Sequence, residues 1–67
     1  MKLYDIPKGS KIKLQIMHEK EEKEFEEMCT FHHLDGMYSY ITTEDGSVVH
    51  LGAVTELKKV NNHYELI

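Results

Sequence analysis

The chain has 67 residues, of which 40% are apolar and 30% charged, with a formal net charge of −4, a single cysteine and no arginine. A chain of this length buries only about 60% of the surface it would expose when unfolded, which excludes two domains and a deep cleft between lobes. No apolar run exceeds two residues, whereas a membrane helix needs about 20. A lone cysteine is typical of a reducing compartment. We expect one domain over residues 1–67, cytoplasmic and away from membranes.

The first quarter of the chain predicts an extended segment, a turn and a strand. Residues 1–10 form the N-terminal extended segment, which ends in a turn at Lys8–Ser10. Ile12, Leu14 and Ile16 then alternate with polar residues. This period of two indicates a strand with one buried and one solvated face.

The segment from His18 to His33 fits two structures. Its charged first half is rich in helix formers, which allows an α+β alternative with a short helix near 18–30 packed on a β-meander. Read as a strand, the odd positions from Phe25 to His33 share one largely apolar face. The Asp-Gly pair that follows favours a hairpin turn, which needs a strand before it. We therefore expect a charged loop at 18–23 and a strand at about 24–33.

Turn signals at short spacing divide the second half of the chain. Asp-Gly pairs at 35–36 and 45–46 favour tight hairpin turns, and the pair Asn61-Asn62 tolerates positive φ. Residues 37–43 are rich in Tyr, Thr and Ile, which are good strand formers. The pattern predicts an antiparallel meander.

Five or six short strands in so small a chain must close, or nearly close, to protect their edges. The sequence therefore predicts a mainly β fold, a small antiparallel barrel of five or six strands. The opening Leu3-Tyr4-Asp5 and residues 8–12 resemble the start of SH3 domains, over about a sixth of the chain. The long acidic loop that separates these elements in SH3 domains is missing, as is any tryptophan for a proline-reading groove. The resemblance thus implies an SH3-like barrel shape and no peptide-binding function.

The whole charge imbalance comes from residues 19–27, which hold six glutamates and two lysines. Such a run is either a solvated surface or a docking surface for a basic partner. Tyr38 and Tyr40 are two apart on a predicted strand and so share a face, which either forms an outward aromatic platform or covers one end of the barrel. The candidate partner-binding residues are Glu19, Glu21, Glu22, Glu24, Glu26, Glu27, Tyr38 and Tyr40.

Candidate metal ligands cluster in the middle of the chain, where Cys29, His32 and His33 fall within five residues. On a regular strand His32 and His33 point to opposite faces, which leaves Cys29 and His33 as the weak metal candidates on a shared face. The chain has no paired ligand knuckles, no Gly-rich phosphate loop and no room for a catalytic cleft. We expect no catalytic residues, no enzymatic activity and no cofactor.

The sequence thus predicts a small non-enzymatic protein-interaction or regulatory module that docks on another protein, with a basic surface as the natural complement. One alternative is a nucleic-acid-binding small β-barrel, which the tyrosine pair would suit but the acidic, arginine-free composition disfavours. A second is a small metal-binding domain near Cys29 and His33. Pairing between exposed edge strands would give a homodimer. The composition also fits an accessory protein of a phage or mobile element.

Overall fold

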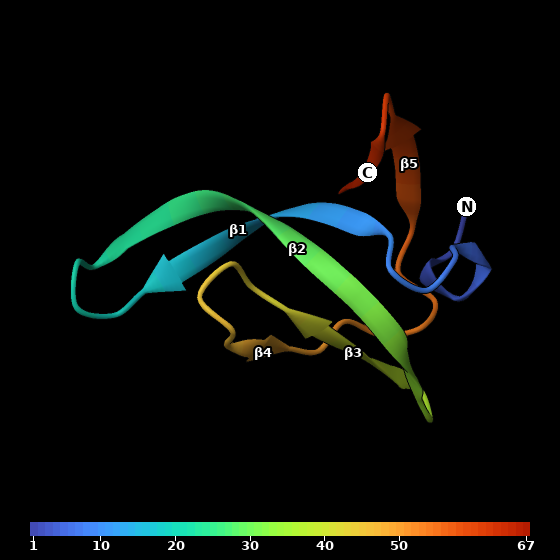
Figure 1. Ribbon diagram of the computed structural model, residues 1–67, viewed down its shortest axis with the longest axis horizontal. Coiled ribbons are helices and arrows are strands. Elements are labelled where there is room, and N and C mark those ends of the chain that lie inside the picture. Colours follow the sequence, from blue (N-terminus) through green and yellow to red (C-terminus); the bar gives the residue numbers. More distant parts are fainter.

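The structure is a computed structural model that describes all 67 residues and shows one six-stranded sheet preceded by a turn of 3-10 helix (Figure 1). In chain order the elements are η1 (Leu3–Asp5), β1 (Lys11–His18), β2 (Lys23–Asp35), β3 (Tyr38–Thr42), β4 (Val48–Val49), β5 (Leu57–Val60) and β6 (His63–Leu66). The strand order across the sheet is β4-β3-β2-β1-β6-β5. The expected mainly β fold is confirmed. The chain contains no helix with the length and apolar character needed to cross a membrane.

The segment 18–33 forms a charged turn and a strand, and the alternative with a helix near 18–30 is wrong. β1 and β2 pair antiparallel over the full length of β1, and the four residues 19–22 connect them. Along β2 every second side chain points to the core, so that Cys29 is 0% and Phe31 3% exposed. A helix would place these two side chains on different faces, because its period is 3.6 and not 2.

The core lies on one side of the curved sheet and is built from nine buried side chains. These are Leu3, Ile6, Ile12, Leu14, Cys29, Phe31, Ile41, Leu57 and Tyr64. Every strand except the two-residue β4 contributes at least one of them, and the N-terminal segment adds two. Because no strand can bury its apolar face alone, the core requires the N-terminal turn and all the longer strands to be in place.

A β-bulge interrupts the pairing of β2 with β3 between Phe31 and His33. His32 lies on the outer face, where its Nε2 hydrogen-bonds the hydroxyl oxygen Oγ1 of Thr42 at 2.7 Å, and the extra residue turns His33 to that face as well. The rings of His32 and His33 both lie 5.3 Å from that of Tyr40. The expectation that these two histidines point to opposite faces is therefore wrong, because that alternation holds only for a regular strand.

The sheet differs from the expected barrel in two respects. It is mixed, because β6 runs parallel to β1 and residues 50–56 supply the crossover that such a neighbour needs. It is also open, since the edge strands β4 and β5 do not pair with each other. The N-terminal segment lies against this crossover: the N–H groups of Leu3 and Tyr4 donate to the carbonyls of Thr55 and Ala53 at 2.9 and 3.1 Å. The expected antiparallel barrel is thus corrected to an open mixed sheet.

Ile12, at the centre of the sheet between β2 and β6, should be sensitive to the loss of one methyl group. We expect Ile12→Val to lower the free energy of unfolding by about 1 kcal/mol, because a fully buried methyl is lost and the cavity is not refilled. Val54→Ala, at a side chain that is 64% exposed, serves as the control and should change it by less than about 0.5 kcal/mol. Urea denaturation measures both. Equal losses for the two variants would contradict the assigned core.

Candidate functional site

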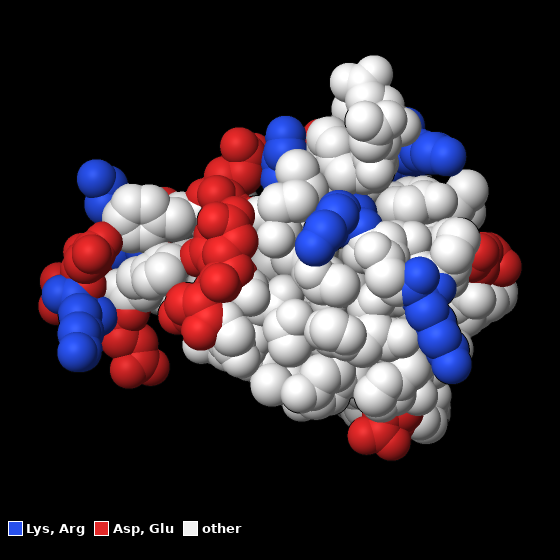
Figure 2. Space-filling model, viewed as in Figure 1, with Lys and Arg blue, Asp and Glu red and all other residues white.

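The acidic run is divided by the strand pairing into an exposed part and one buried residue. The exposed carboxylates belong to Glu19, Glu21, Glu22, Glu24 and Glu26, which lie on the turn and on the outer face of β2. We call residues 17–26, which form the turn between β1 and β2 and the strand ends next to it, the acidic hairpin. Figure 2 shows the acidic side chains gathered at this end of the molecule, on the left of the view.

The exposed glutamates of the acidic hairpin have no ion-pair partner within the chain. The acids that form ion pairs are Glu27, Glu56 and Glu65. The two lysines of the hairpin do not offset the glutamates by direct contact either: Lys23 places its Nζ over the ring of Phe25, 5.6 Å from the centroid. The hairpin therefore presents five solvated carboxylates that form no ion pair and that outnumber its two lysines.

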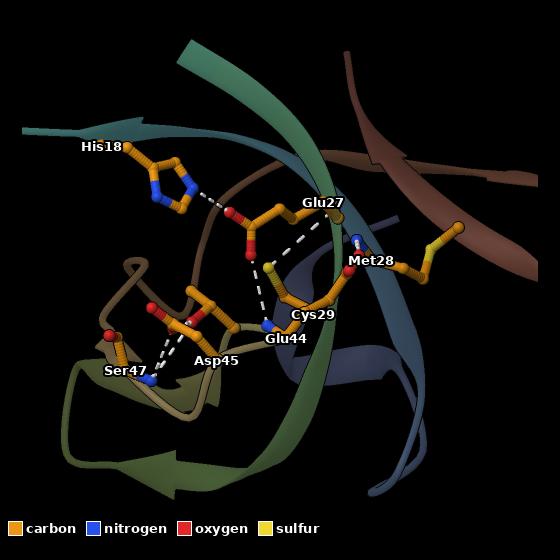
Figure 3. A network of polar contacts seen from close by, with 8 residues as sticks. His18, Glu27, Met28, Cys29, Glu44, Asp45 and Ser47 are labelled. Atoms are coloured by element: carbon orange, nitrogen blue, oxygen red, sulfur yellow. Dashed lines mark hydrogen bonds and ion pairs between the residues drawn. The ribbon is translucent and has the colours of Figure 1, made fainter. Parts of the chain in front are cut away.

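Glu27 is the buried residue of the run, 8% exposed on the core side of β2. Its carboxylate accepts a hydrogen bond from Nε2 of His18 at 2.5 Å and another from the backbone N–H of Glu44 at 3.2 Å (Figure 3). The ring of Phe25 meets the His18 ring edge-on at 4.9 Å and holds it in this orientation. Of the candidate partner-binding glutamates, Glu27 alone uses its carboxylate in hydrogen bonds within the chain.

The β3–β4 turn brings two further acids to the same place. The carboxylate of Glu44 accepts the backbone N–H of Met28 at 2.9 Å, which fastens the turn to β2. Asp45 accepts hydrogen bonds from the Thr43 hydroxyl and from the backbone N–H of Ser47, the latter at 3.1 Å. These bonds, the Thr43 hydroxyl first, lower the pKa of Asp45 to about 2. The turn was expected from the sequence, but nothing in its spacing signals that it lies beside the acidic hairpin.

Together these residues surround a shallow hollow between the acidic hairpin and the β3–β4 turn. Its lining is His18, Glu21, Phe25, Glu26, Glu27, Glu44 and Asp45. Five carboxylates around one aromatic ring attract a cation, and the aromatic face suits the stem or head group of a lysine or arginine side chain. No group of three or more His, Cys, Asp and Glu side chains in the chain could hold a metal ion. The hollow therefore fits a basic side chain better than a bare metal ion.

The tyrosine pair lies on the outer face of the sheet, at the far end of β2 from the acidic hairpin. Ser39 and Ile41 are fully buried, so Tyr38 and Tyr40 point away from the core. Tyr40 is partly covered by His33, whose ring stacks on it at an interplanar angle of 3°, whereas Tyr38 is 61% exposed. Tyr40 pairs with His33, seven residues along β2 from Glu26, or about 23 Å at about 3.3 Å per residue. The two candidate surfaces share a face without touching.

The weak metal candidates Cys29 and His33 are not brought together. Cys29 lies in the core with its thiol 0% exposed, while His33 stacks on Tyr40 on the outer face. The bulge at residue 32 lies between them and breaks the alternation on which a shared face depended. Burial, followed by the nearby charges of Glu27 and Glu44, raises the pKa of the Cys29 thiol. A buried, protonated thiol is a packing residue and a poor nucleophile.

Comparison of the chain with protein-family models, with curated proteins and with solved structures finds no match. The functional interpretation therefore rests on the geometry described above.

The depressed pKa of Asp45 predicts a pH-dependent contribution to stability. Because the carboxylate is favoured in the folded state, its contribution is fully present above its ordinary pKa of 3.8 and is lost as the pH falls through about 2. We expect wild type to exceed Asp45→Asn in free energy of unfolding at pH 6. The difference should shrink between about pH 4 and about pH 2. Urea denaturation at a series of pH values measures it. Asp35→Asn, at a carboxylate without such hydrogen bonds, is the control. A difference that persists unchanged to pH 2 would contradict the assigned network.

The burial of Cys29 predicts slow thiol chemistry in the folded protein. We expect the reaction with Ellman's reagent at pH 7 to be slower than in guanidinium chloride by on the order of a hundredfold, because access and thiolate formation both require opening of the core. The absorbance of the released thiolate measures both rates. Rates within about threefold of each other would place the thiol at the surface.

Proposed function

We propose that the chain is a non-enzymatic protein-interaction module that docks on a basic surface of another protein through its acidic hairpin. The observation that carries the proposal is the set of five exposed glutamates without ion-pair partners, on a hairpin that extends from the core. Evenly mixed surface charges would leave no such imbalance, and unpaired like charges on one element repel each other unless a partner neutralises them.

The hollow beside the hairpin supports a specific contact as well as general attraction. Glu44 and Asp45 are held in place by hydrogen bonds to the backbone of β2 and of their own turn, and Phe25 supplies an aromatic wall. Charges that are already oriented lose little entropy when a lysine or arginine side chain enters. We propose that one basic side chain of the partner occupies this hollow while its neighbours contact the exposed glutamates.

The tyrosine face enters the proposal as a second contact area. Tyr38, with Met37 at 78% exposed beside it, offers apolar surface for a partner large enough to span the length of β2. Its distance from the acidic hairpin means that a short peptide reaches one area or the other. A nucleic-acid partner is less well supported, because the projecting surface is acidic and repels phosphate. We also propose that the protein is cytoplasmic and that it acts without a bound metal ion.

The test is a pair of variants that change the net charge equally at different places. Glu21→Gln with Glu24→Gln removes two carboxylates from the acidic hairpin, and Val54→Lys with Asn62→Lys adds two lysines at exposed positions elsewhere. We expect capture of a partner from nuclease-treated lysate, and its affinity measured with the purified partner, to fall by roughly threefold to tenfold in the first variant, because each exposed pair contributes about 0.2–1 kcal/mol. The lysine variant should fall less.

The salt dependence provides the second readout. The affinity of the wild type should decrease between about 50 and about 200 mM salt, since exposed charges are screened over this range. Equal affinity for both variants, or an affinity that ignores salt, would refute docking through the acidic hairpin. Material captured only when nuclease is omitted would favour a nucleic-acid partner instead.

A further inference from the structure

The edge of β1 that faces away from β2 is only partly covered. β6 lies beside β1 at Ile12 and Lys13 and no further, because its register ends there. From Leu14 to His18 no strand pairs with this edge of β1, and Figure 1 shows β5 and β6 at the opposite end of β1 from the hairpin turn. An uncovered strand edge inside a sheet, as opposed to a short outermost strand, is an unusual liability that proteins tend to block.

The backbone groups that this edge presents can be assigned from the pairing pattern. The N–H of Phe31 donates to the carbonyl of Ser10 at 2.9 Å, just before β1 begins. Because backbone hydrogen bonds alternate along an antiparallel pair, the even-numbered residues of β1 bond to β2. The odd-numbered ones, Gln15 and Met17, direct their N–H and C=O groups to the open edge. These are the groups that an added strand would pair with.

An apolar groove of about 320 Å³ follows the same edge. Its apolar lining consists of Leu14, Ile16, Val49, Leu51 and Leu66. Three of these, Ile16, Val49 and Leu51, are only partly buried and pack against the core. The floor of the groove is therefore continuous with the core and partly exposed to solvent. A strand added to β1 would direct every second side chain into this groove and the remaining ones to the outer face.

The charges around the groove indicate what kind of strand fits. Glu26 lines the groove and has no ion-pair partner, whereas Lys13 is balanced by Glu65 at 3.5 Å. The acidic hairpin, in which five glutamates outnumber two lysines, continues directly from this edge. A second copy of the chain would bring its own acidic hairpin to the same interface, and like charges oppose that arrangement. A basic strand has the complementary charge.

We propose that the open edge of β1, from Leu14 to His18, accepts an extended segment of the partner protein in which apolar side chains alternate with lysine or arginine. The apolar side chains fill the groove, and the basic ones lie on the outer face near Glu24 and Glu26. The segment spans five residues, about 16 Å, and adds a strand to the sheet by backbone pairing with Gln15 and Met17. This inference rests on the proposed function and specifies the form of its partner.

The test uses three synthetic heptapeptides, acetylated and amidated: alternating lysine and valine, the same residues in two blocks, and alternating glutamate and valine. We expect the alternating lysine peptide to bind at least about tenfold more tightly than the block peptide by calorimetry, and the glutamate peptide not to bind. In the complex, the amide protons of Gln15 and Met17 should exchange with solvent at least about tenfold more slowly, measured by NMR on the unmodified chain.

A matched pair of variants isolates the backbone contribution. Met17→Pro removes an N–H that points to the open edge and leaves the bonds to β2 in place, which edge strands tolerate. Met17→Ala keeps that N–H. We expect the proline variant to lose at least about tenfold in affinity for the alternating lysine peptide, and the alanine variant to lose less than about threefold. The exchange measurement on the wild type remains decisive if the proline variant does not fold.

The outcomes separate the two proposals. One outcome is that both lysine peptides bind with equal affinity, that salt and the variant Glu21→Gln with Glu24→Gln weaken this binding, and that Met17→Pro leaves it unchanged. That outcome refutes the strand addition, while docking through the acidic hairpin stands. If neither lysine peptide binds, both proposals are refuted for a basic peptide partner. If the chain alone sediments as a dimer in which Gln15 and Met17 are already protected from exchange, the occupant of the edge is a second copy.

Discussion

The structure depends on the requirement that the carboxylate of Glu27 be hydrogen-bonded where it is buried. An unpaired carboxylate on the core side of a strand would cost several kcal/mol, so the group must find donors at that depth. His18 comes from the adjacent strand and the Glu44 amide from the β3–β4 turn. One buried charge therefore fixes the position of three segments. The acidic hollow follows from it, because the turn that supplies the amide also carries Glu44 and Asp45.

The features that follow local rules could be predicted from the sequence. The alternation of Ile12, Leu14 and Ile16 gave a strand, and the Asp-Gly and Asn-Asn pairs fall at turns where Gly36, Gly46 and Asn61 have positive φ. The strand at about 24–33 was predicted for a similar reason, since the Asp-Gly pair that follows it favours a hairpin turn and such a turn needs a strand on each side. The exposed glutamates were candidates on charge alone. In each case the physical cause lies within a few neighbouring residues.

The features that escaped prediction depend on contacts between distant segments. No local signal marks the bulge at His32, which turns His33 to the same face as His32. The parallel placement of β6 depends on the path of residues 50–56, and Glu44 and Asp45 join the site only through pairing across the sheet. Glu27 resembles its glutamate neighbours in sequence, and only the register of β2 assigns it to the core. Tertiary pairing, which one sequence specifies weakly, accounts for all four.

The bulge also bears on how the length of this chain can change. Phe31 pairs with Ile41 and His33 with Tyr40, so His32 is the residue without a cross-strand partner. Deleting it would leave the same two pairs adjacent in an unbroken ladder, with every core side chain of β2 and β3 still facing inward. A deletion of Thr30, in contrast, would place Cys29 and Phe31 on opposite faces and move one of them to the solvent side. Evolution or a protein engineer can therefore shorten this strand at residue 32, whereas the spacing of the core-facing residues of β2 is fixed.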